Sequence, residues 1–128
     1  MHKSRLAAFV IDSKVDDIEQ ANTFWESALG LKCKRSDEDW SDRYSSLQTE
    51  SHEPHLLIQK VSHQSRIHLD IETDNIDAEV QRLEKLGAKI VEAKTRWVVM
   101  EAPTGHRFCV VNPQRSDFDN ADNTNIWQ

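Results

Sequence analysis

Glycine is scarce in this sequence, whose 128 residues include only three, at positions 30, 87 and 105. Loops that cradle phosphate groups need several closely spaced glycines, because the backbone must approach the phosphates without intervening side chains. The sequence therefore excludes a glycine-rich nucleotide-binding loop.

Cysteine is also rare. Cys33 and Cys109 lie far apart and belong to no CxxC or histidine-containing pair. A disulfide framework or a structural zinc site would need more cysteines at closer spacing. We therefore expect both cysteines to be small buried hydrophobes in a protein of the reducing cytoplasm.

Long apolar runs and basic stripes are missing as well. No run approaches the roughly 20 apolar residues of a membrane-spanning helix, and the apolar stretch near the N-terminus ends at Asp12, so we expect no signal peptide. Sixteen Lys and Arg residues are scattered among 22 Asp and Glu residues, for a net charge of −6. Nucleic acid and membrane are therefore not expected as partners, since both favour clustered positive charge.

The remaining composition is that of a globular protein, with 38% hydrophobic and 30% charged residues. The chain length suits one domain with a sizeable core. Hydrophobic periodicity then locates the elements along the chain.

In the first half, a strand over 5–12 precedes a helix that begins at Ile18 and ends at Gly30. The helix is predicted by apolar residues spaced three and four apart, and its end by a glycine suited to the left-handed conformation. Further strands are expected over 31–36, 43–49 and 55–61. Trp40 lies in the polar loop between the first two of these, where it is a candidate lid or partner contact.

The second half repeats this order. A strand over 66–72 leads to a helix capped by Asp74 and stopped at Gly87, with a predicted apolar stripe of Ile76, Val80, Leu83 and Leu86. Strands are expected over 88–94, 96–101 and 106–112. The polar tail from Pro113 is expected to be irregular and pinned at Phe118 or Trp127.

Matching segments indicate that the two halves are an internal repeat. AFVID at 8–12 corresponds to HLDIE at 68–72, and the helix-ending LG at 29–30 corresponds to LG at 86–87. The plan of strand, helix and three strands therefore occurs twice.

Five segments, in order, carry a resemblance to a known superfamily. They are FWESALG at 24–30, LLIQKV at 56–61, RIHLDIE at 66–72, EVQRLEKLGA at 79–88 and WVVMEAPTGHRFCVV at 97–111. On these segments the chain resembles the vicinal oxygen chelate (VOC) superfamily, the glyoxalase, bleomycin-resistance and dioxygenase group, and within it the glyoxalase-like small proteins.

The resemblance implies an α+β fold, in which two tandem βαβββ modules form a curved, cup-shaped mixed sheet with the helices outside. It implies a single domain over 1–113, with modules over about 5–61 and 66–112, followed by an irregular tail over 114–128. It also implies a homodimer.

The same resemblance implies where a metal would be held. Metal-dependent relatives use a His on the first strand, an acid or polar residue on the fourth, a His on the fifth and a Glu on the eighth. Carried over, these positions are Ala8, approximately Gln59, His68 and Arg107 here, so only His68 matches the pattern outright. Alanine supplies no lone pair, and an arginine would repel a divalent cation. We therefore expect the inherited metal site to be lost and no cofactor to be needed.

Two alternatives stay open around His68. A shifted metal site could be rebuilt from His68, Glu72 and Glu101, with Asp70 and His106 as further candidates. Arg107 either forms an ion pair with Asp70 or Glu72, or receives an anionic ligand through its planar guanidinium.

Three functions follow as hypotheses. The first is binding of a small organic ligand in the cup, without the family's catalytic metal, and its predicted contacts are His68, Asp70, Gln59, Trp97 and Arg107. The second is a lyase, isomerase or dioxygenase in which His68 is a metal ligand or a general acid or base. The third is sequestration of a cationic drug, as in bleomycin resistance, which the negative net charge permits.

Overall fold

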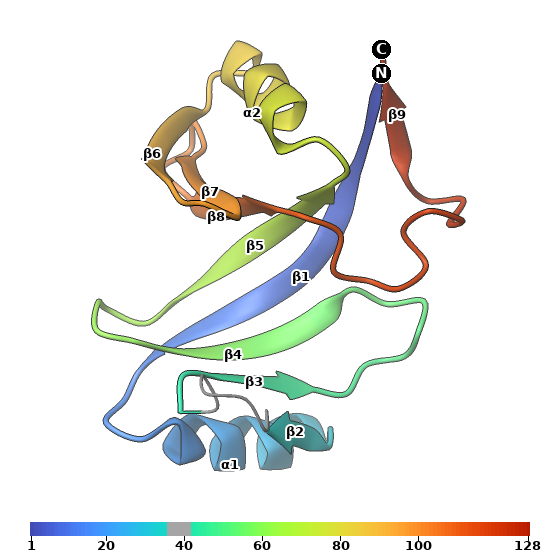
Figure 1. The fold of residues 1–128 in the computed structure, drawn as a ribbon. Coiled ribbons are helices and arrows are strands. Elements are labelled where there is room, and N and C mark those ends of the chain that lie inside the picture. The colour runs from blue at the N-terminus through green and yellow to red at the C-terminus, as the bar shows by residue number, and fades with distance from the viewer. Residues whose placement is uncertain (36–41) are drawn as a thin grey trace. The chain divides into compact units, whose positions relative to one another are not determined.

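The computed structural model describes residues 1–35 and 42–128, so the predicted lid residue Trp40 lies outside the described residues. The fold is α+β, as predicted, and the order strand, helix, three strands occurs twice (Figure 1). The elements are β1 His2–Lys14, α1 Ile18–Leu29, β2 Cys33–Arg35, β3 Tyr44–Leu47, β4 His55–Val61, β5 Arg66–Thr73, α2 Ile76–Lys85, β6 Lys89–Ala93, β7 Trp97–Glu101, β8 Arg107–Val111 and β9 Asn125–Trp127. Neither helix in this described part is long and apolar enough to cross a membrane.

The chain divides into two compact units. The N-terminal unit is Ala8–Ile67, and the C-terminal unit joins Met1–Ala7 to His68–Gln128. Strand β1 contributes to both, because its first residues belong to the C-terminal unit and its remainder to the N-terminal unit.

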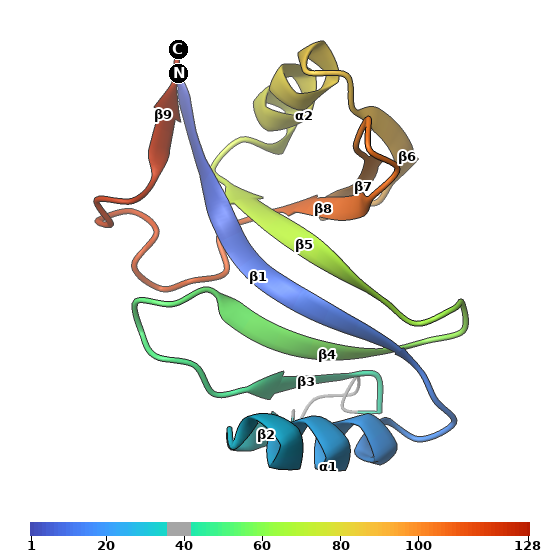
Figure 2. The same cartoon turned by 180° about the vertical axis from the view of Figure 1, so that it is seen from behind.

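In the N-terminal unit, β1 and β4 are parallel neighbours, and β3 and β2 continue the sheet with antiparallel pairing (Figure 2). Helix α1 begins at the N-cap Asp17, whose side chain accepts a hydrogen bond from the Glu19 backbone N–H, and ends at Gly30 with a φ of 65°. The predicted helix is thereby confirmed. The predicted apolar stripe runs from Ile18 to Leu29, but the buried part is shorter, because Ile18 and Ala21 are buried whereas Leu29 is 46% exposed.

The C-terminal unit places β8 between β5 and β7, with β6 beyond β7. Helix α2 packs on one face of these strands, where its Val80 and Leu83 join a buried cluster with Met100, Phe108 and Val110. Leu86, predicted to belong to this stripe, is 65% exposed because the helix has already ended.

The cap of α2 also differs from the prediction. Asn75 is the N-cap, and its side chain accepts from the Ala78 backbone N–H at 3.0 Å. Asp74 instead accepts a hydrogen bond from the Lys3 backbone N–H at 2.8 Å. Asp74, which the sequence predicted to cap α2, is therefore bound to the backbone of β1 instead.

The tail is not irregular throughout, which corrects the prediction. Its last residues form β9, which pairs antiparallel with the start of β1, and the Trp127 indole Nε1–H donates to Ser4 Oγ at 2.8 Å. Phe118 is 2% exposed. Phe118 and Trp127, the two aromatic residues predicted to anchor the tail, therefore both hold it against the C-terminal unit.

Candidate functional site

The C-terminal unit presents one sheet face away from α2. The even-numbered residues of β7 and β8, such as Met100 and Phe108, pack toward the helix, so the odd-numbered ones face the other way. Strand β5 joins this face in register, because Asp70 is paired with Cys109. We call the resulting surface the polar face; its members are His68, Asp70, Trp97, Val99, Glu101, Arg107 and Cys109.

Three members of the polar face come together closely. His68 Nε2 lies 3.3 Å from Asp70 Oδ1, and the two side chains are 12% and 14% exposed. Their potential ligand atoms and Cys109 Sγ all lie within 4.8 Å of one another. Among residues 1–35 and 42–128, this is the one group of three or more His, Cys, Asp or Glu residues so placed.

Arg107 has a different partner from those predicted. Its Nε donates to Glu101 Oε1 at 3.2 Å, and both side chains are 36% exposed. Asp70 instead contacts His68, and Glu72 accepts from the Arg5 guanidinium at 2.6 Å. Of the two alternatives for Arg107, the ion pair with Asp70 or Glu72 is therefore wrong, because its direct neighbour on β7, Glu101, supplies the carboxylate.

The shifted metal set of His68, Glu72 and Glu101 is not assembled. Glu72 is fully buried, and its second oxygen accepts the backbone N–H groups of Gln114 and Arg115, at 2.7 and 2.9 Å. Both oxygens of the Glu72 carboxylate therefore accept hydrogen bonds from Arg5 and from the start of the tail, and they are not available to a metal ion. Glu101 is committed to Arg107.

The other predicted site residues lie on separate elements. Gln59 belongs to the N-terminal unit, where its side chain donates to Tyr44 Oη at 3.0 Å. Ala8 is buried, and His106 lies in the exposed turn before β8, in contact with Thr104 Oγ1 at 2.7 Å. Trp97 stays on the polar face and is 38% exposed.

Cys109 is the residue that the sequence interpretation missed. It was predicted to be buried, yet it is only partly buried and lies beside His68 and Asp70. The signal was available, because two-residue alternation along β8 gives Cys109 the same face as Arg107. Cys109 is therefore identified as a candidate site residue by the face of β8 on which it lies, and not by being a cysteine.

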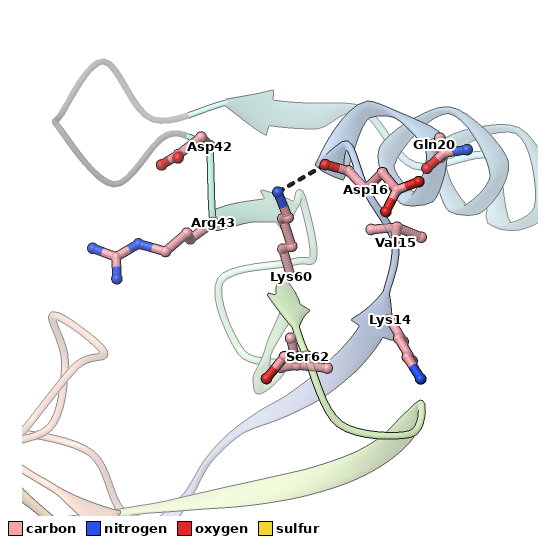
Figure 3. A pocket seen from close by; sticks show the side chains of 9 residues that line it. Lys14, Val15, Asp16, Gln20, Asp42, Arg43, Lys60 and Ser62 are labelled. Atoms are coloured by element: carbon pink, nitrogen blue, oxygen red, sulfur yellow. Dashed lines mark hydrogen bonds between the residues drawn. The ribbon is translucent and has the colours of Figure 1, made fainter.

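The N-terminal unit contains a hollow of about 770 Å³ near the start of α1 (Figure 3). Its lining includes the cationic side chains of Lys14, Arg43 and Lys60 together with the carboxylates of Asp16 and Asp42. Lys60 Nζ donates to the Asp16 backbone oxygen at 2.7 Å. The mixed charges give this hollow no clear preference for a ligand of one sign, so the polar face is the stronger candidate.

Comparison with known proteins identifies the family to which the fold belongs. The family model described as a glyoxalase-like domain matches residues 8–111. Methylmalonyl-CoA epimerase from Mycobacterium tuberculosis has a similar structure, with a TM-score of 0.62 at 16% identity, covering 85% of this chain and 87% of that one. A hypothetical protein from Bacillus halodurans has a TM-score of 0.61 at 14% identity, covering 87% and 95%.

A longer protein matches over part of its length. For an extradiol ring-cleaving dioxygenase from B. fuscum the TM-score is 0.56 at 15% identity, and the match covers 86% of this chain but 32% of that one. Such identities show a shared fold and no more. No curated protein matches the sequence significantly. With the family model covering most of its length and the repeated strand and helix order in place, the chain belongs to the glyoxalase-like family of the VOC superfamily.

Proposed function

We propose that this protein binds a small organic ligand on the polar face of the C-terminal unit, without the family's catalytic metal. The observation that carries the proposal is the cluster of His68, Asp70 and Cys109 on a sheet face turned away from α2. A hydrogen-bonding cluster on one side and an exposed aromatic ring on the other suit a ligand with a polar and an apolar end.

The chemistry of the polar face supports this reading. Arg107 and His68 can donate hydrogen bonds, Asp70 can accept them, and Trp97 offers an apolar surface. The names of two structural neighbours, an epimerase of methylmalonyl-CoA and a ring-cleaving dioxygenase, describe reactions on small organic molecules. A carboxylate or carbonyl group on an aromatic or acyl skeleton is the ligand class that these side chains fit.

The departures from the family's ligand set support binding without the inherited metal. Ala8 is 1% exposed and has no donor atom. Gln59 is a neutral amide rather than a carboxylate, and its Nε2 donates to Tyr44 Oη. Arg107 brings a permanent positive charge to the eighth strand.

Ligand binding is expected in chelator-treated protein and is measured by amide chemical shifts. A panel of aromatic carboxylates, 2-oxo acids and acyl-CoA thioesters is expected to include a compound that shifts residues of β5, β7 and β8. Arg107→Gln should weaken its binding about tenfold, since a charged hydrogen bond contributes about 1.5–3 kcal/mol. The control is Arg35→Gln, an arginine of the N-terminal unit that pairs with Glu19. Shifts confined to other elements, or equal effects of the two variants, would contradict the proposal.

A second candidate function is an enzyme that uses His68 as general acid or base. The 3.3 Å contact with Asp70 favours it, because a carboxylate orients an imidazole and stabilises its protonated form. For any substrate that is turned over, His68→Gln is expected to abolish one limb of the pH–rate profile, and Asp70→Asn to lower the rate because the imidazole loses the carboxylate that orients it. A profile that is unchanged in His68→Gln would remove the histidine from the reaction.

A further inference from the structure

The hollow in the N-terminal unit has no part in the proposed ligand binding, yet charged side chains of both signs line it. We infer that it binds a small zwitterion, a compound of di- or tripeptide size that carries one carboxylate and one ammonium group. The cationic lining residues are Lys14, Arg43 and Lys60, and the acidic ones are Asp16 and Asp42. The inference goes beyond the proposed function and does not depend on it, because the described residues that line the hollow include none from the polar face.

The hollow lies where two parallel strands end. Lys14 and Val61 are the last residues of β1 and β4, and they are direct pairing partners in the sheet. From β1 the chain continues through Val15 and Asp16 into α1, whose first turn contributes Gln20 to the lining (Figure 3). The crevice outside the carboxyl ends of parallel strands is a recurrent place for ligands, because the connecting segments separate there.

Lys60 holds three segments of this wall together. Its backbone N–H donates to the Arg43 backbone oxygen at 2.8 Å, and its Nζ donates to the Asp16 backbone oxygen at 2.7 Å (Figure 3). The residue is partly buried, so the ammonium group has a defined position. An ammonium group has three N–H donors, and one bond to a neutral carbonyl leaves its positive charge and its other donors for a ligand.

The charges that line the hollow do not neutralise one another. In the described part of the chain, neither Asp16 nor Asp42 forms an ion pair with any of the three cationic side chains. The arginines and lysines that do pair with a carboxylate lie elsewhere; they are Arg5, Arg35, Arg66, Arg82, Lys94 and Arg107. A ligand with one group of each sign can pair with a cation and a carboxylate together, whereas a simple anion or cation would also meet a like charge.

The rest of the lining and the volume indicate the size of the ligand. Gln20 and Ser62 supply an amide and a hydroxyl that can bond peptide groups, and Val15 and Val61 supply a small apolar surface. The volume of about 770 Å³ falls within the range of about 300–1,000 Å³ for pockets that take drug-sized ligands. Such a space is larger than a single amino acid requires, which favours a short peptide.

Titration of the full chain with three related peptides tests the inference, with amide chemical shifts as the measurement. The probes are trialanine, N-acetyl-trialanine, which lacks the ammonium group, and trialanine amide, which lacks the carboxylate. Trialanine is expected to shift residues 14–16, 43 and 60–62. Each derivative should bind about tenfold more weakly, because it loses the charged hydrogen bonds of one end.

Two variants separate the two ends of the ligand. Arg43→Gln should weaken binding of trialanine and of N-acetyl-trialanine about threefold, the effect of one exposed ion pair, and should not weaken binding of trialanine amide. Asp16→Asn should weaken binding of trialanine and of trialanine amide by a similar factor, and should not weaken binding of N-acetyl-trialanine. A merely structural effect of either substitution would change all three affinities together.

The matched control is Lys32→Gln, which removes an exposed lysine of the same unit outside the hollow and should leave all three affinities unchanged. Folding of each variant is checked by circular dichroism. No binding of trialanine, equal binding of the three probes, or equal effects of Arg43→Gln and Lys32→Gln would overturn the inference. Shifts on β5, β7 and β8 report the polar face instead, so the proposed function and this inference can fail independently.

Discussion

Replacing Glu72 with alanine is expected to lower the free energy of unfolding by about 3–5 kcal/mol, the range for breaking a buried ion pair from one side. Glu72 is fully buried, and Oε2 accepts from Arg5 Nε at 2.6 Å. Oε1 accepts the backbone N–H groups of Gln114 and Arg115. The substitution would therefore leave a buried guanidinium Nε–H and two backbone donors without their acceptor.

The same substitution is expected to loosen the tail, because the bonds to 114 and 115 are where the tail leaves β8 for the rest of the C-terminal unit. Urea unfolding followed by circular dichroism measures the stability, and limited proteolysis of residues 114–128 measures the release of the tail. Faster cleavage of the tail should accompany the lower stability.

Asp117→Asn is the matched control, since Asp117 also binds Arg5 at 2.6 Å but its side chain is 49% exposed. Water can replace the lost interaction there, so the loss should be much smaller than for Glu72→Ala. An equal decrease in the free energy of unfolding in the two variants would contradict the structural argument, because it would show that the burial of Glu72 does not determine the size of the decrease.

Local patterns in the sequence were sufficient to predict most elements. The strand over 55–61 was predicted with the boundaries that β4 has, because the apolar segment HLLIQKV directly follows Pro54. The helix ending at Gly30 was likewise predictable, since its stripe and its left-handed end are both short-range features. The three-residue β9 was missed because so short a segment has no periodicity to detect.

The roles of the polar-face residues could be predicted only in part. Two-residue alternation placed His68, Asp70 and Glu72 on one face of a strand. It could not show that Glu72 is covered, because the groups that bind it come from residues 5, 114 and 115. The grouping of Cys109 with Asp70 likewise depends on the pairing of β5 with β8, which the order of elements alone does not fix.

Glu79→Gln is expected to lower the free energy of unfolding by about 3 kcal/mol at neutral pH, with a smaller loss in acid. Burial would raise the pKa of Glu79, but hydrogen bonds from Arg82, His2 and Ser4 outweigh it and hold the pKa below its usual value of 4.5. His2 Nε2 lies 2.7 Å from the carboxylate, and Arg82 donates to it twice at 2.8 Å. The neutral amide can reproduce only part of this network.

The lowered pKa fixes the direction of the pH dependence. Between the folded-state pKa of Glu79 and its usual 4.5, the unfolded chain binds more protons, so stability rises with pH there. The contribution of Glu79 is complete above that window and is lost as pH falls through the folded-state pKa. Urea unfolding at stepped pH values should therefore show wild type and Glu79→Gln converging in acid.

The comparison variant is Glu84→Gln, which removes an exposed carboxyl from the same helix and should change stability by less than about 0.5 kcal/mol. Two other carboxyls, of Glu19 beside Arg35 and Asp117 beside Arg5, have lowered pKa values through hydrogen bonds from those arginines and stay intact in both variants. They keep some acid sensitivity in Glu79→Gln, so the expected signature is a shallower pH slope rather than a flat one. A slope equal to that of wild type would mean that Glu79 does not supply the acid-labile part of the stability.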